Sequence, residues 1–199
     1  MLYPSSLNNL IESFKKLPGI GEKTAIRLAF YVMNFTSEEA EKFSNNIMDV
    51  KNKIKNCSIC GTLSDSDICI ICKDKTRNDK TLIVVEDSKD VFLFEKMGIF
   101  DGYYHVLGGL ISPIDDIGPD DIRIKEMLDR ITNDNFSEII LAIKTSIEAD
   151  TTSLYIKRLL ENKPVVISRI ASGIPIGADM DYVDALTLES ALKNRKEVL

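Results

Sequence analysis

The sequence predicts an α+β protein made of several modules in succession. Three observations support this fold class. Apolar residues recur at helical spacing through residues 5–54, all four cysteines fall between positions 57 and 72, and strand-like runs alternate with helical patterns after Lys80. The 199 residues, 44% of them hydrophobic, suffice to bury one full core or two small ones. The expected order is a helical bundle, a four-cysteine zinc finger, an α/β domain with a parallel sheet, and a C-terminal strand and helix.

The first module is predicted to begin with two helices, at residues 5–16 and 22–34. Each carries apolar residues at i, i+3, i+4 and i+7, which places them on one face. The inward residues are expected to be Leu7, Leu10, Ile11, Phe14, Ile26, Ala29, Phe30 and Met33. The connector Leu17-Pro18-Gly19-Ile20-Gly21 predicts a sharp turn, because glycine lets the backbone adopt conformations that other residues avoid.

This pattern is that of a helix-hairpin-helix, which binds the DNA backbone without sequence preference. The free amides at the start of the second helix would attract phosphate, and Lys23 and Arg27 would add positive charge. The candidate DNA-binding residues are Gly19, Gly21, Lys23 and Arg27. An ordinary helical hairpin with a solvated lysine and arginine remains an alternative, because G-x-G alone is a weak signal.

A third helix is predicted from Thr36, which would form a capping box with Glu39. Its apolar residues are expected to point inward and complete a small bundle. They are Ala40, Phe43, Ile47, Val50 and Ile54.

The cysteines are predicted to bind one structural zinc ion. Their spacing, Cys57-x2-Cys60-x8-Cys69-x2-Cys72, supplies two C-x-x-C pairs and so a closed tetrahedral set of four thiolates. A redox pair is the alternative, but redox C-x-x-C motifs occur singly. No lysine or arginine lies between the first and the last cysteine, so the segment is expected to be a rigid joint between modules rather than a DNA reader.

The remainder alternates strands and helices, which predicts a parallel sheet with right-handed crossovers. Strands are expected at 81–85, 103–107, 138–143 and 164–170, and helices at 88–97, 121–131 and 151–161. Ligands of such sheets bind at the carboxyl ends of the strands, where Glu86 falls and where Asp87, Asp90 and Glu148 could stand nearby. His105, inside a predicted strand, is expected to have a structural role only.

Charge is unevenly distributed along the chain. Residues 1–80 hold 12 basic and 10 acidic side chains, a net +2, whereas residues 81–199 hold 13 and 21, a net −8. Any nucleic-acid contact is therefore expected in the first part. The N-terminus lacks the pattern of a signal peptide, and no apolar run is long enough for a membrane span, so a cytoplasmic protein is predicted. The expected DNA binding would associate it with the nucleoid.

Several stretches in order resemble one known family. They are LPGIGEKTAIRLAF, the double C-x-x-C, VVEDSKDVFLFEKMGIFDGYYHVLGGLISPIDDIGPDDIRI and SRIASGIPIGADMDYVDALTL. Together they resemble the bacterial recombination mediator family RecR. The resemblance implies a helix-hairpin-helix domain at 1–53, a zinc finger at 54–76, a Toprim domain at 77–165 and an oligomerisation segment at 166–199. It also implies a dimer or a ring tetramer around single- or double-stranded DNA, acting with RecO and RecF to help load RecA on gapped single-stranded DNA.

Toprim domains in topoisomerases and primases are metal-dependent enzymes, so an enzyme acting on DNA with Mg2+ is the main alternative. Their pattern has a glutamate, matched here by Glu86, and an Asp-x-Asp that appears here as Lys144 and Ser146. An ammonium opposes Mg2+ binding by direct repulsion, so the domain is expected to be non-catalytic. The acidic residues Glu86, Asp87 and Glu148 are expected to bind RecO or RecF instead. A comparable alternative is that Glu86 and Glu148 are simply carboxylates that favour the start of a helix. A protein-binding adaptor without DNA affinity is the third possibility.

Two stretches depart from the family pattern. The run Glu-Gly-Glu-Ala-Thr appears as Glu148-Ala149-Asp150-Thr151-Thr152, and Ala-Arg-Gly appears as Ala171-Ser172-Gly173. The first change is expected to alter the surface at the end of the sheet. The second removes a basic side chain and any contact that it would make.

Overall fold

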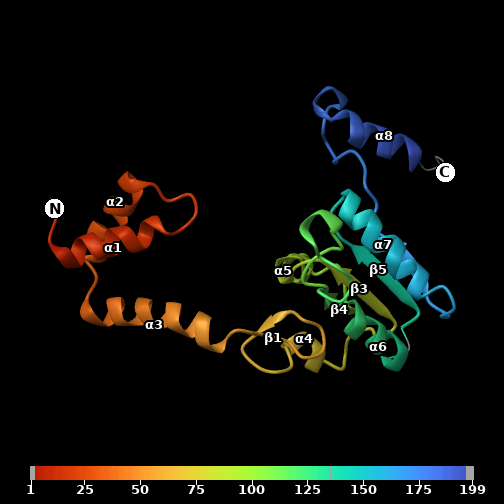
Figure 1. Cartoon of the computed structure of the whole chain (residues 1–199), viewed down its shortest axis with the longest axis horizontal. Coiled ribbons are helices and arrows are strands. Elements are labelled where there is room, and N and C mark those ends of the chain that lie inside the picture. Colours follow the sequence, from red (N-terminus) through yellow and green to blue (C-terminus); the bar gives the residue numbers. More distant parts are fainter. Residues whose placement is uncertain (1–2, 135, 196–199) are drawn as a thin grey trace. The chain divides into compact units, whose positions relative to one another are not determined.

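The computed structural model describes residues 3–134 and 136–195 (Figure 1). The chain forms two compact units, one that ends at Ile54 and one that begins at Lys55. Within the described residues, no helix is both long enough and apolar enough to cross a membrane. The fold class agrees with the prediction.

The first unit contains three helices, α1 (Ser5–Lys15), α2 (Glu22–Val32) and α3 (Ser37–Lys53). Helices α1 and α2 pack against each other around Ile11, Ala25 and Ala29, all of which are buried. The alanines lie one turn apart on α2, and their small side chains let α1 approach closely. Leu7, Leu10, Phe14 and Ile26 lie partly buried around this core, as predicted.

Helix α3 begins with the predicted capping box. The amide of Glu39 donates to Thr36 Oγ1 at 3.2 Å, and the amide of Thr36 donates to Glu39 Oε2 at 2.7 Å. The predicted bundle is wrong, however, because no residue of α3 is buried and Phe43, Ile47 and Val50 are 44%, 55% and 62% exposed. The cap fixes the start of a helix locally and requires no partner for its apolar face.

Two residues of the predicted inner face of the second helix also lie outside the core. Phe30 is 44% exposed and packs edge-on against Tyr3, while Met33 lies beyond the end of α2 and is 63% exposed. The alanines fill the narrow space between α1 and α2, which leaves these larger side chains at its margin.

The second unit starts with a small knuckle made of the antiparallel pair β1 (Lys55–Asn56) and β2 (Leu63–Ser64) and the short helix α4 (Ile70–Lys73). An α/β domain follows. Its elements are β3 (Thr81–Val85), α5 (Ser88–Met97), β4 (Tyr103–Val106), α6 (Ile124–Asp134), β5 (Glu138–Ala142), α7 (Ile147–Leu159) and β6 (Val166–Arg169), with a 3-10 turn, η1, at Pro113–Asp115. After β6 come a second 3-10 turn, η2 (Met180–Tyr182), and helix α8 (Ala185–Lys193).

The four long strands form a parallel sheet in the order β4-β3-β5-β6. Right-handed crossovers place α5 on one face and α6 and α7 on the other, an arrangement that can be followed in Figure 1. Central strand β3 pairs on both sides, so that Val85 lies beside Val106 of β4 and Ala142 of β5. The residues that follow these three strands therefore meet at one edge of the sheet.

Two helix starts differ from the prediction. Helix α6 begins at Ile124 instead of 121, because Asp121 accepts a hydrogen bond from the Gly118 amide at 2.8 Å and belongs to a turn. Helix α7 begins at Ile147 instead of 151, because Ser146 Oγ accepts from the Ala149 amide at 3.2 Å and caps the helix.

One continuous hydrophobic core joins the knuckle to the α/β domain. It includes all four cysteines together with the buried residues of β3, β4 and β5. The cysteine segment was expected to be a joint between modules; in the structure it is built into the larger unit. The module boundaries given above remain a prediction.

Candidate metal centre and nucleic-acid interface

The first two cysteines lie in a tight turn between β1 and β2. The Cys57 amide donates to Thr62 O at 2.7 Å, and the Gly61 amide donates to Cys57 O at 2.9 Å. Gly61 has φ +79°, a left-handed conformation that favours glycine. This turn brings Cys57 and Cys60 to the same side of the hairpin.

The second pair belongs to α4. Cys69 precedes the helix as its N-cap, and its Sγ accepts a hydrogen bond from the Cys72 amide at 3.4 Å. The Cys69 amide in turn donates to Cys57 Sγ at 3.3 Å. Amide donors of this kind stabilise sulfur in its thiolate form, which is the form that binds metal.

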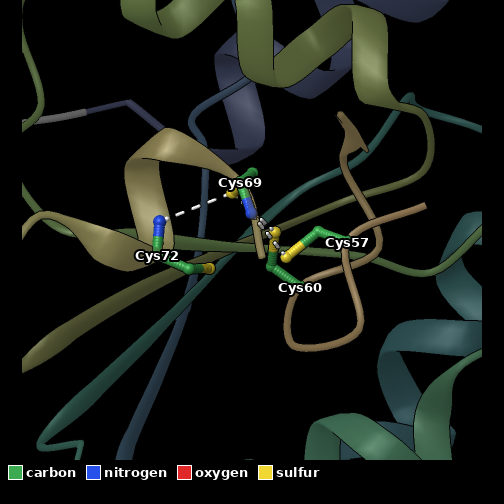
Figure 2. A group of neighbouring side chains, drawn as sticks. All are labelled: Cys57, Cys60, Cys69 and Cys72. Atoms are coloured by element: carbon green, nitrogen blue, oxygen red, sulfur yellow. Dashed lines mark hydrogen bonds between the residues drawn. The ribbon is translucent and has the colours of Figure 1, made fainter. Parts of the chain in front are cut away.

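The four sulfur atoms converge on one point, as Figure 2 shows. All lie within 4.8 Å of one another, all four cysteines are buried, and Cys60 Sγ is 3.6 Å from Cys69 Sγ. A tetrahedral ion with metal–sulfur distances of about 2.3 Å requires sulfurs about 3.8 Å apart. The residues present therefore fit a metal ion held by four thiolates, as the spacing predicted.

Because the four sulfur atoms lie so close together, the ionisation of one thiol changes the pKa of its neighbours. Hydrogen bonding from Cys69 and Cys72 lowers the pKa of Cys60, whereas hydrogen bonding to Cys60 raises the pKa of Cys69 to about 11. One thiolate is thus favoured at the expense of its neighbours. A divalent cation removes this conflict, because it stabilises all four thiolates together.

The predicted DNA-binding residues lie at the turn between α1 and α2. Gly19 has φ +78°, and Gly21 is the N-cap of α2, where it offers no side-chain oxygen to the amides of the first turn. Lys23 and Arg27 are exposed, and within the described part of the chain neither forms an ion pair. Glu22 also lies in this first turn and partly offsets the positive end of the helix.

The acidic edge of the sheet holds Glu86, Asp87 and Glu148 together with a lysine. Lys144 Nζ lies 3.0 Å from Glu86 Oε1, because Glu86 follows β3 and Lys144 follows the neighbouring strand β5. Asp87 caps α5 by accepting from the Lys89 amide at 2.9 Å. A cavity of about 370 Å3 opens here, and it is lined in part by Glu86, Asp87, Asp90 and Lys144.

Glu148 lies in the first turn of α7. A hydrogen bond from Ser146 is the main cause that lowers its pKa, and its own backbone amide and the charge of Lys144 act in the same direction. Glu148 is therefore ionised at neutral pH. Lys144 thus lies near two carboxylates, Glu86 and Glu148, at the carboxyl end of the sheet.

Sequence reasoning missed Arg169 at this edge. Its guanidinium donates to Asp150 Oδ1 and, at 3.0 Å, to the carbonyl oxygen of Lys144, which fixes the backbone that carries the lysine. Arg169 ends the fourth strand, so the rule that drew attention to Glu86 would have found it as well.

These features define a class of protein, one in which a helix-hairpin-helix domain, a four-cysteine metal site and a Toprim domain follow one another. The chain matches three family descriptions: "RecR, helix-hairpin-helix" at residues 7–51, "Toprim domain" at 80–171 and "RecR, C-terminal" at 173–196. It is 45% identical over 199 residues to the recombination protein RecR of Lactobacillus delbrueckii subsp. bulgaricus, and 45% identical over 198 residues to that of Streptococcus pyogenes serotype M49, with 100% of each chain covered. The chain belongs to the RecR family of recombination proteins.

Proposed function

We propose that this chain is a non-catalytic, DNA-binding recombination mediator in the cytoplasm. In this proposal it assembles as a dimer or ring tetramer and acts with RecO and RecF to help load RecA on gapped single-stranded DNA. The observation that carries the proposal is the start of α2, where an uncapped helix end coincides with exposed Lys23 and Arg27. Membership of the RecR family supports the same function.

The proposed contact is with phosphate. Amides of the first turn of α2 would donate to phosphate oxygens, and the two cations would neutralise neighbouring charges. Gly19 and Gly21 have open space where a side chain would begin, so the turn itself presents backbone to the ligand. None of these groups reads a base, so the binding should be independent of sequence.

Salt dependence tests this contact. Replacing both Lys23 and Arg27 with alanine should weaken binding and reduce the slope of log K against log salt by about 1.8 for duplex DNA. A matched control replaces Lys42 and Lys51 of α3, which carry the same charge and are exposed. An unchanged slope in the Lys23 and Arg27 variant would refute the contact.

For the metal centre we propose one zinc ion, held by Cys57, Cys60, Cys69 and Cys72, with a structural role. Four thiolates suit zinc and leave no position for a reactive water. Native mass spectrometry should find one zinc ion per chain, and none in the Cys57 and Cys60 double serine variant.

We propose that the α/β domain is non-catalytic because a lysine lies at the carboxyl end of its sheet. Lys144 Nζ already pairs with Glu86, and a second positive charge there would be repelled. The enzyme alternative is favoured by Glu86 alone, and DNA cleavage that needs Mg2+ and disappears in Glu86→Gln would revive it.

We propose that the three carboxylates of this edge, Glu86, Asp87 and Glu148, bind RecO or RecF through charge complementarity. Charge reversal of Glu148 to lysine should lower the association rate with that partner, and the loss should shrink in high salt. An effect of equal size for Glu161→Lys, two residues beyond the C-terminal end of α7, would argue against a local site.

A further inference from the structure

The turn that carries Cys57 and Cys60 is docked onto the acidic edge of the sheet. Cys60 O accepts a hydrogen bond from the amide of Val106, the last residue of β4, at 2.7 Å. Two residues after Gly61, the Leu63 amide donates to Ser88 Oγ at 3.2 Å. The turn is thus bonded to two elements of the α/β domain.

Ser88 links this turn directly to the proposed partner face. It is 6% exposed, begins α5, and follows Glu86 and Asp87 immediately. A cavity of about 220 Å3 lies at the contact and is lined in part by Gly61, Leu63, Glu86 and Asp87. A displacement of the turn would therefore move Ser88 and, with it, the adjacent carboxylates Glu86 and Asp87.

The contact is also closely packed. A side chain on Gly61 would begin 3.0 Å from Val106 O and 3.1 Å from Arg123 Nη1, which is closer than such atoms normally approach. The turn fits this position only because residue 61 is glycine.

We infer that metal binding by the four cysteines orders the acidic edge at Glu86–Ser88, so that this face is metal-dependent. Residues 57–72 form no core of their own. The hydrogen bonds that join their halves include those from the Ser58 amide to Asp67 O at 2.8 Å and from the Cys69 amide to Cys57 Sγ at 3.3 Å, and a metal held by all four cysteines would link the halves more strongly. Without it, Val106 loses an acceptor and Ser88 loses the donor that fixes its side chain. The inference that the metal orders residues 86–88 depends only on the hydrogen bonds to Cys60 and Ser88. Only its consequence for RecO or RecF binding rests on the proposed function.

Hydrogen exchange of the full chain tests the inference. Removing the metal with a chelator should raise exchange in residues 55–76 and also in 85–91 and 104–109, while 150–160 in α7 stays protected. A rise confined to 55–76, with the sheet still protected, would overturn it.

A substitution tests the same coupling if removal of the metal unfolds the whole second unit. Ser88→Ala keeps every cysteine but leaves the Leu63 amide without its acceptor. Because linkage is reciprocal for binding free energies, we expect faster exchange at residues 61–64 and also a zinc affinity, measured in competition with a chelator, that is lower by about fivefold, the equivalent of ~1 kcal/mol.

The matched control is Ser153→Ala, whose Oγ donates to Ala149 O at 2.6 Å on α7, away from the knuckle. It should leave the zinc affinity unchanged. A zinc affinity of Ser88→Ala equal to that of the unaltered protein would refute the coupling, and since the assay uses neither DNA nor a partner, the proposed function would be unaffected.

Discussion

His105 lies completely buried in β4, at 0% exposure, and is the only histidine of the chain. Its Nε2 is 2.8 Å from the carbonyl oxygen of Arg123; because a carbonyl can only accept, Nε2 carries the hydrogen. Nδ1 is buried without a partner among the described residues. A second proton on the ring would therefore be a buried, unpaired charge.

Burial lowers the pKa of His105 from 6.5 to about 4, and the charges of Arg123 and Arg130 act in the same direction. Below pH 6.5 the unfolded chain takes up a proton that the folded chain does not. The stabilisation is thus complete above pH 6.5 and is lost as the pH falls toward 4. With these two pKa values, the free energy of unfolding should fall by about 2 kcal/mol between pH 7.5 and 5, and by about 3 kcal/mol at pH 4.

Urea unfolding followed by circular dichroism, with zinc in excess, measures this loss. His105→Gln serves as the reference, because its amide nitrogen can take the place of Nε2 and donate to Arg123 O but does not titrate. Carboxylates and cysteines titrate in both proteins, so the difference between the two pH profiles isolates the histidine. Parallel profiles between pH 7.5 and 5 would refute the reasoning.

Two further substitutions test hydrogen-bond networks of the larger unit by urea unfolding. Arg77 donates two hydrogen bonds to Glu95, at 3.0 and 2.6 Å. Arg77→Ala should therefore lower the free energy of unfolding by about 2–3 kcal/mol, which is toward the low end for a broken buried pair because the Glu95 side chain is 31% exposed. Arg77→Lys should recover part of this loss. Thr152 Oγ1 accepts from the Ile111 amide at 2.9 Å; Thr152→Val should cost about 1–3 kcal/mol and speed proteolysis within residues 108–120, whereas Thr151→Val on the exposed side should not.

Local signals in the sequence predicted most of the architecture. The capping box at Thr36, the strand at 81–85 and the cysteine spacing each depend on residues close together in the chain, and the structure confirms all three. The end of α5 at Gly98, which has φ +64°, is another case. Such features are fixed by backbone geometry and hydrogen bonds within a few residues.

Features that depend on distant residues were not predicted as well. The apolar face of α3 has the periodicity of a buried helix, yet periodicity cannot specify what covers it. The start of α7 is a local exception: the cap at Ser146 involves only the nearby Ala149 amide, but Ser146 is interpreted from the sequence only as a substituted aspartate, which places the predicted start four residues too late. Docking of the cysteine turn on Ser88 joins residues 25 positions apart and leaves no periodic signal.

The order of the knuckle and the sheet along the chain has a consequence during synthesis. All four cysteines leave the ribosome before β3, but β6, the last strand, is complete only when Arg169 has been added. At elongation rates of about 5–20 residues per second, the 97 residues from Cys72 to Arg169 take about 5–20 s. For that time the thiols lack the core that later encloses them, so early metal capture would protect them from oxidation and offer the nascent strands β3 and β4 an already folded surface.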